Sequence, residues 1–344
     1  MNSSTNSSSS IDQARLQAAF DRAFSQPTEL GLTLAALVVH HGEVVAERYH
    51  SEGDFGVTAT DTLISWSMAK SVTHAIIGIL VRDGRIDIHA PAPVPAWHNT
   101  PGDPRAAITT EQLLRMTSGL QWVEDYVDDS TSHVIDMLFG EGTHDVATYA
   151  AALPLNHAPG TVSNYSSGTT NILCRIAADV IAPDAADGGE SAMREFLQRE
   201  LFDPLGMSSA SPRFDTAGTF VGSSYLYCTA RDFARFGELY LHNGMANGKQ
   251  ILPPSWIAHA RTLTPESTVD DVHDYGAQWW LWRQGPGTVG LGTHNVYGCH
   301  GYEGQYILIA PDDDLVVVRL GKTPAELQPA LRANVAEMVL SFLE

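Results

Sequence analysis

Apolar residues near the start of the chain follow first a helical and then a strand-like spacing. Four of them recur on one face of a helix predicted over residues 11–25: Leu16, Ala19, Phe20 and Phe24. Two runs rich in β-type residues, 33–40 and 44–49, follow, and the polar sequence around Gly42 separates them. This arrangement predicts a hairpin, so a β-sheet is expected to begin early in the chain.

The strongest helical pattern begins after Ser65. Its apolar positions have the i, i+3, i+4, i+7, i+8 spacing of a helix that buries one face: Val72, Ala75, Ile76, Ile79 and Leu80. Asp83-Gly84 is typical of the end of such a helix. A buried helix is therefore expected to carry the residues just after Ser65.

The rest of the chain divides into a helical middle and a mixed end. Helical segments dominate the middle, at 110–116, 134–139, 146–152, 169–181 and 191–202. A helix is then predicted at 230–241, β-type runs at 277–282, 305–309 and 315–320, and a closing helix at 324–343. Strands at both ends around central helices predict an α/β (α+β) fold with an antiparallel sheet flanked by helices.

This order of elements also predicts a division into domains. Residues 11–80 and 216–344 are expected to form the α/β sheet domain, with a mostly helical domain of residues 81–215 inserted between them. The polar run of residues 1–10 is expected to be a disordered tail.

Composition limits the classes of partner and the cellular compartments that are expected for this chain. The formal net charge of −20 argues against a nucleic-acid or anionic membrane partner. The N-terminal run lacks the basic start and apolar core of a secretory signal, and every apolar run is too short to span a bilayer. Three widely spaced cysteines, Cys174, Cys228 and Cys299, indicate free thiols. The expected location is therefore the cytoplasm.

Ser67-Met68-Ala69-Lys70 could carry chemistry. A spacing of three places both polar side chains on one helix face, close enough for Lys70 to accept the Ser67 proton. A serine in the first helical turn also lies at the positive end of the helix dipole, where an oxyanion is stabilised. The alternative is an exposed lysine one turn from a helix-capping serine. The chain has only three lysines, which makes a chance match less frequent.

The segment 65–71 resembles the nucleophile motif of the serine β-lactamase and penicillin-binding-protein superfamily. It is most similar to class C β-lactamases, family VIII esterases and 6-aminohexanoate-dimer hydrolases. Further framework segments support the resemblance from about residue 30 to the C-terminus: 113–119, 204–207, 231–237 and 275–280. The resemblance implies a β-lactamase/transpeptidase-like fold, with Ser67 as the nucleophile and Lys70 as its base.

The second catalytic element of this superfamily is a Y-x-N motif or a variant of it. Asn164-Tyr165-Ser166-Ser167 follows a Pro-Gly turn where that motif is expected. The resemblance implies that Tyr165 relays protons between the nucleophile, the lysine and the leaving group. Ser167 stands in place of the usual asparagine and is expected to contact substrate. The alternative for Tyr165 is a tyrosine packed at a domain seam.

The third element, K-T-G, is where the sequence departs from the pattern. The resemblance aligns Cys299-His300-Gly301 with it, so the cationic lysine that helps β-lactamases hold a substrate carboxylate is missing. The backbone N–H of Tyr302 is expected to join that of Ser67 in an oxyanion hole. His300 and Gly301 are expected to contact substrate, with Gly301 allowing close approach to the strand.

Glu124-Asp125-Tyr126 resembles the loop of 6-aminohexanoate-dimer hydrolases whose tyrosine contacts the scissile amide. This implies a substrate contact for Tyr126, and the alternative is a tyrosine in an acidic surface loop. The histidines and cysteines show no metal-ligand spacing and no phosphate loop is present, so neither a metal nor another cofactor is expected.

These residues together predict a serine hydrolase that forms an acyl-enzyme with a small-molecule carboxylic ester or linear amide. An acyltransferase that uses the same acyl-enzyme, and a β-lactamase or D-Ala-D-Ala peptidase, are alternatives. A non-catalytic ligand-binding or sensor domain is the alternative from a different class. The pattern indicates no particular oligomeric state.

Overall fold

A computed structural model of the 344-residue chain describes residues 11–51, 53, 55–126, 131–265, 274–283 and 289–343. The tail predicted at residues 1–10 lies outside this part of the chain. All statements below refer to the described residues.

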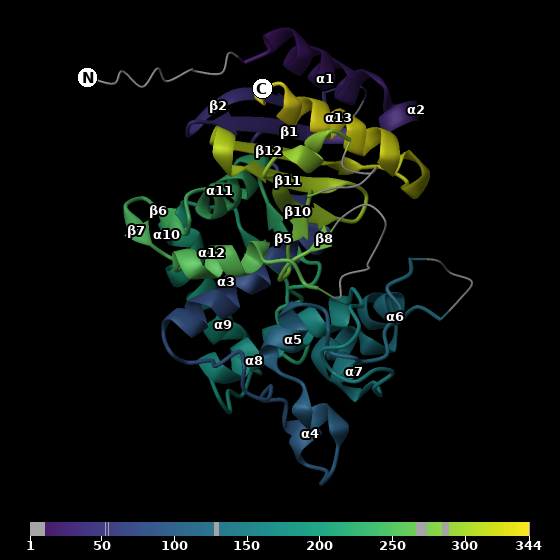
Figure 1. Cartoon of the computed structure of the whole chain (residues 1–344), viewed down its shortest axis with the longest axis vertical. Coiled ribbons are helices and arrows are strands. Elements are labelled where there is room, and N and C mark those ends of the chain that lie inside the picture. Colours follow the sequence, from purple (N-terminus) through teal and green to yellow (C-terminus); the bar gives the residue numbers. More distant parts are fainter. Residues whose placement is uncertain are drawn as a thin grey trace.

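A seven-stranded antiparallel sheet forms the upper half of the molecule (Figure 1). Its strand order is β2-β1-β12-β11-β10-β9-β8, so strands from the first and last parts of the chain pair within one sheet. The strands are β1 (Leu32–His40), β2 (Glu43–Tyr49), β8 (Asp274–Tyr275), β9 (Trp280–Leu281), β10 (Tyr297–Gly301), β11 (Gln305–Ala310) and β12 (Leu315–Lys322). The predicted fold class and the predicted hairpin, β1 with β2, are confirmed.

Helices cover both faces of the central strands. Figure 1 shows α1 (Gln13–Ser25) and α13 (Gln328–Leu340) side by side above the sheet. Alternate residues of β1 face them, such as Val38, while their neighbours, such as Leu37, face α3 (Ala69–Arg82) and α11 (Ala230–Leu241). Burial on both faces is why these strands appear in the sequence as continuous apolar runs.

Helices make up most of the lower half (Figure 1). They are α4 (Pro95–His98), α5 (Thr110–Leu114), α6 (His133–Phe139), α7 (Val146–Ala152), α8 (Ser167–Ile181) and α9 (Glu190–Leu197). The remaining elements are α2 (Pro27–Leu30), α10 (Asp203–Leu205), α12 (Pro254–Arg261), a small sheet of β3 (Leu63–Ile64), β4 (Ser211–Pro212) and β5 (Leu226–Cys228), and the hairpin of β6 (Met245–Ala246) with β7 (Lys249–Gln250).

The secondary-structure prediction was incomplete in several places, and two of them lie near the middle of the second half of the chain. The run at 277–282 forms a strand only at Trp280–Leu281, because the backbone of Gln278 adopts a positive φ of 61° that breaks the extended conformation. The sequence pattern did not indicate α12, whose eight residues begin with proline and bury only three side chains.

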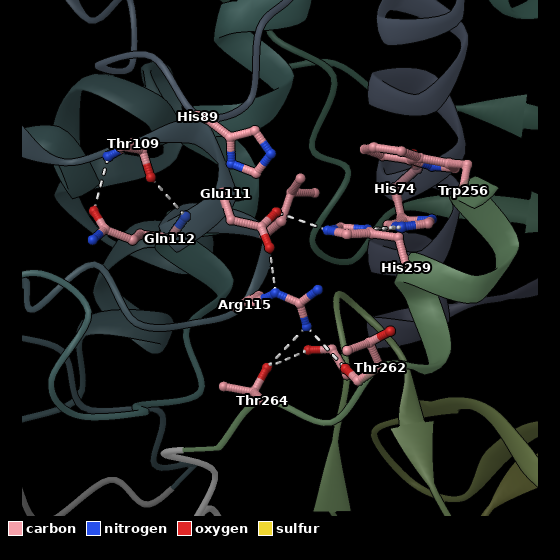
Figure 2. Close-up of polar contacts among 12 residues, drawn as sticks. His74, His89, Thr109, Glu111, Gln112, Arg115, Trp256, His259, Thr262 and Thr264 are labelled. Carbon is pink, nitrogen blue, oxygen red and sulfur yellow. Dashed lines mark hydrogen bonds and ion pairs between the residues drawn. The ribbon is translucent and has the colours of Figure 1, made fainter.

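A row of stacked polar rings connects the helical part to the sheet part (Figure 2). The His74 Nδ1 atom lies 2.8 Å from the Tyr240 hydroxyl, and its Nε2 lies 3.2 Å from Nδ1 of His259. The His259 Nε2 atom lies 2.7 Å from a carboxylate oxygen of Glu111, which also accepts from Arg115. The row thus links α5 to α12, α3 and α11.

All three cysteines are free, as the sequence predicted, and the structure buries each of them. Within the described ranges, no helix has the length and apolar character that crossing a membrane would need.

Candidate active site

Ser67 lies in a 3₁₀ turn, Trp66–Met68, that leads directly into α3. Trp66 precedes it in the left-handed region, with φ of 44°, a conformation that costs a non-glycine residue roughly 1–3 kcal/mol. Ser65 holds the turn against β5, because its N–H donates to the Leu226 carbonyl at 2.8 Å and its Oγ accepts from the Leu226 N–H at 3.1 Å. Strain and anchoring at this point fix the direction of the Ser67 side chain.

Lys70 lies one turn further along α3 and is 1% exposed. Its Nζ atom is 2.9 Å from Ser67 Oγ, 2.9 Å from Ser167 Oγ and 3.0 Å from the Ser223 carbonyl. Burial lowers the pKa of Lys70 to about 8, although the carboxylate of Glu124 acts in the opposite direction. A lysine in this state can lose a proton near neutral pH and accept one from Ser67.

Tyr165 is packed between the helical part and the sheet edge. Its ring lies 5.1 Å from that of Trp280 and meets the Tyr275 ring edge-on at 5.7 Å, and Lys70 Nζ lies 4.9 Å from its centre. Burial raises the pKa of Tyr165 well above its usual range. The side chain therefore stays a phenol at physiological pH, suited to donate a proton rather than to act as the initial base.

Ser167 begins α8 and is fully buried, so it does not line the cavity described below. Its Oγ donates to one carboxylate oxygen of Glu124 at 2.5 Å, and its N–H donates to the other at 2.8 Å. Trp122 Nε1 donates to that second oxygen at 2.5 Å. Sequence reasoning placed Ser167 in substrate contact and missed Glu124, whose only signal was its position two residues before Tyr126.

The end of β10 lies directly against the nucleophile turn. A Cβ atom added to Gly301 would lie 2.3 Å from the Ser65 carbonyl oxygen, so a glycine is required for this approach. Tyr302 follows and is 42% exposed, with its ring 5.6 Å from that of Trp66 and stacked on that of Tyr126 at 4.5 Å. The structure thus brings the residues predicted for an oxyanion hole, Ser67 and Tyr302, to neighbouring segments.

Cys299 and His300 point to opposite faces of β10. Cys299 is buried among the side chains that face α3, and burial raises the pKa of its thiol to about 12. His300 faces the other side, where its Nε2 accepts a hydrogen bond from Trp282 Nε1 at 2.9 Å and its ring stacks on Trp280. Of these two residues, only His300 lines the cavity.

A cavity of about 540 Å³ opens beside Ser67. Its walls are aromatic and polar, formed by Ser67, Glu124, Tyr126, Ser163, Asn164, Tyr165, Trp280, His300, Gly301 and Tyr302. Trp280, Ser163 and Asn164 join the residues that the sequence indicated. Among the described residues that line this cavity there is no arginine or lysine.

Nothing in the described part of the chain gathers three or more His, Cys, Asp or Glu side chains in a geometry that could hold a metal ion.

Residues 20–340 match the family profile described as Beta-lactamase. A 6-aminohexanoate-dimer hydrolase from Paenarthrobacter ureafaciens is 28% identical over 316 residues, covering 87% of this chain and 75% of that protein.

Solved structures share the fold at lower identity. A Bacillus anthracis protein provisionally described as a 6-aminohexanoate-dimer hydrolase superposes with a TM-score of 0.73 at 23% identity, covering 92% of this chain and 80% of that one. A family VIII carboxylesterase superposes with a TM-score of 0.68 at 14% identity, covering 96% and 98%. At these identities the structures establish the fold.

Proposed function

Because the chain belongs to the Beta-lactamase family, we propose that it is a serine hydrolase that cleaves a carboxylic ester or a linear amide through an acyl-enzyme. The observation that carries the proposal is the 2.9 Å contact between Lys70 Nζ and Ser67 Oγ, made by a fully buried lysine. The curated relative named 6-aminohexanoate-dimer hydrolase supports a hydrolase.

Acylation begins when neutral Lys70 accepts the Ser67 proton and Ser67 Oγ bonds to the substrate carbonyl carbon. The backbone N–H groups of Ser67 and Tyr302 stabilise the oxyanion of the tetrahedral intermediate. Tyr165 then donates its phenolic proton to the leaving oxygen or nitrogen as the bond to carbon breaks, and Lys70 returns a proton to Tyr165. A water molecule releases the acyl group by the reverse sequence of proton transfers.

The cavity wall favours substrates that carry no anionic group near the scissile bond. Tyr126, Tyr302 and Trp280 offer flat apolar surfaces, and His300 adds a polar edge. A β-lactam carries a carboxylate, and the described lining residues include no arginine or lysine to pair with it. We therefore place simple esters and linear amides ahead of β-lactams and cell-wall peptides as substrates.

We also propose a reducing compartment, with the cytoplasm as the location. Three free, buried thiols support this, since oxidising compartments favour disulfides.

A substrate panel tests the function. The purified chain is incubated with p-nitrophenyl acetate and butyrate, nitrocefin and a linear 6-aminohexanoate oligomer, and products are followed by absorbance and mass spectrometry. The proposal expects turnover of an ester or of the oligomer, little turnover of nitrocefin, and an acyl adduct on Ser67 in the intact-mass spectrum. Ser67→Ala should abolish both while the thermal unfolding temperature stays close to that of the parent.

Two outcomes would overturn the proposal. Turnover that survives Ser67→Ala would place the nucleophile elsewhere, and the absence of both turnover and adduct would favour a ligand-binding protein. Added alcohols or amines that divert the acyl group from water would identify acyl transfer as the main reaction.

A further inference from the structure

We infer that Glu124 is a positioning residue: acting through the Ser167 hydroxyl, it forces the lone pair of neutral Lys70 to point at Ser67. This rests on the proposed function, because it concerns how the base of that reaction is oriented. Glu124 need not touch substrate in this role.

The hydrogen-bond directions around Lys70 follow from the chemistry of its partners. The Ser223 carbonyl, 3.0 Å from Lys70 Nζ, can only accept. Ser167 Oγ carries one proton, and the Glu124 carboxylate at 2.5 Å takes it because a carboxylate can only accept. Ser167 Oγ therefore also has to accept from Lys70, at 2.9 Å. Two of the three positions around Nζ must hold protons.

The third position faces Ser67 Oγ at 2.9 Å. When Lys70 loses a proton, the loss has to occur in this direction, because the other two protons are held by groups that cannot donate in return. The lone pair of the neutral amine then points at the hydroxyl proton of Ser67 and can accept it. Without Glu124, the Ser167 hydroxyl could turn its proton toward Nζ and occupy that lone pair.

The same carboxylate also acts on Lys70 through its charge. The titratable groups around Lys70 in the described ranges are Glu124, Cys174 and Tyr165. Glu124 favours the protonated lysine and raises its pKa, whereas burial lowers it. Removing the charge and removing the hydrogen-bond direction should therefore have different kinetic signatures.

Glu124→Gln is the decisive substitution because the other contacts of Glu124 dictate how the amide is oriented. Its Oε2 accepts from the Ser167 N–H and from Trp122 Nε1, so the amide oxygen must take that place. The amide nitrogen then faces Ser167 Oγ and donates to it, which frees the Ser167 hydroxyl to donate to Lys70. We expect kcat at the pH plateau to fall roughly 10-fold or more with little change in KM.

Glu124→Gln should also move the acid limb of the kcat/KM profile to lower pH, because Lys70 loses the charge that favours its protonated form. This shift reports the charge of Glu124, whereas the fall in the plateau kcat reports the hydrogen-bond direction. Asp125→Asn removes the same charge from the adjacent, exposed position and serves as the matched control, with kcat and the pH limb expected to stay at the parent values.

Ser167→Ala and the double variant Ser167→Ala/Glu124→Gln complete a cycle. If Glu124 acts through Ser167, adding Glu124→Gln to Ser167→Ala should leave the plateau kcat almost unchanged, while the acid limb still shifts. The inference would be overturned if the fold-losses in kcat of the two single variants multiplied in the double variant. It would also be overturned if Glu124→Gln kept the parental kcat. If Glu124→Gln does not fold, the Ser167→Ala variant tests the inference by itself. A plateau kcat of Ser167→Ala equal to that of the parent would then reject the inference.

Turnover by the parent chain and its loss in Ser67→Ala are measured first, on the same ester. Their absence would reject the proposed function, whereas the inference about Glu124 fails only when the parent is active and the cycle does not show coupling.

Discussion

Gly301 lies so close to the nucleophile turn that a Cβ atom at this position would come within 2.3 Å of the Ser65 carbonyl oxygen. The last residue of β10 and the segment that carries Ser67 are therefore in backbone contact. This contact sets the distance between the two N–H groups proposed for the oxyanion hole.

Gly301→Ala should push β10 away from the turn. We expect kcat on a p-nitrophenyl ester to fall at least about 10-fold, because the oxyanion donors separate. Overpacking should also cost about 1–3 kcal/mol of stability. Gly56→Ala is the control, since its added Cβ would be 3.9 Å from the nearest atom. A Gly301→Ala enzyme with the parental kcat would show that the turn does not depend on this contact.

The pH dependence of kcat/KM should report the Lys70 base. Its pKa lies at about 8, so only about one tenth of the lysine is neutral at pH 7. Activity should therefore rise with pH, reach half of its plateau near pH 8 and level off above about pH 9. Tyr165, whose pKa is raised, should stay protonated over this range. A profile measured from pH 5.5 to 9.5 that stays flat below pH 8 would contradict this role for Lys70.

The buried row of rings around His74 should make the protein less stable in mild acid. Burial, together with His259 and Arg115, lowers the pKa of His74 well below 6.5, and Tyr240 and Trp256 also pack against its ring. Below pH 6.5 the unfolded chain binds a proton that the folded His74 does not. The free energy of unfolding should then fall with decreasing pH, by up to about 1.4 kcal/mol per pH unit from this group.

The variant His74→Gln removes this titration. Its stability should vary less between pH 6.5 and 5 than that of the parent, and at pH 8 it should be about 1–3 kcal/mol less stable because buried partners lose hydrogen bonds. Urea unfolding midpoints across this range measure both effects. If the unfolding free energies of the two proteins changed equally with pH, groups other than His74 would cause the acid sensitivity.

Arg319, on β12, should support the turn that carries Tyr302. It is fully buried and donates to the carbonyls of Glu303 and Gly304 at 3.2 and 2.8 Å and to Thr323 Oγ1 at 2.8 Å. Arg319→Met should cost at least about 2 kcal/mol and lower kcat, because the turn loses these donors. Thermal unfolding and ester kinetics test this.

Arg22→Met is the control for Arg319, since Arg22 pairs with Glu29 at an exposed position and should contribute less than about 1 kcal/mol. If Arg319→Met lost stability but kept its kcat, catalysis would not depend on the support that Arg319 gives to the turn that carries Tyr302.

The sequence was informative where the signal is local. The spacing of Ser67 and Lys70 places both on one helical segment whatever the surroundings, and the apolar period of α3 predicted its buried face. The antiparallel sheet built from both ends of the chain followed from the order of the elements, and the structure confirms it. The domain limits and the roles of the site residues stay predictions.

Only the tertiary structure revealed the partners of Lys70. Ser167 and Ser223 lie 97 and 153 residues away in the chain, and Glu124 reaches the site through Ser167. No sequence period connects such positions, because their contact depends on how α8, the 124–126 loop and α3 pack. The same holds for the lowered pKa of Lys70, since burial is a property of the assembled fold. The sequence by itself thus indicated Ser67 as the nucleophile that we propose, and packing decided the contacts and the burial of Lys70.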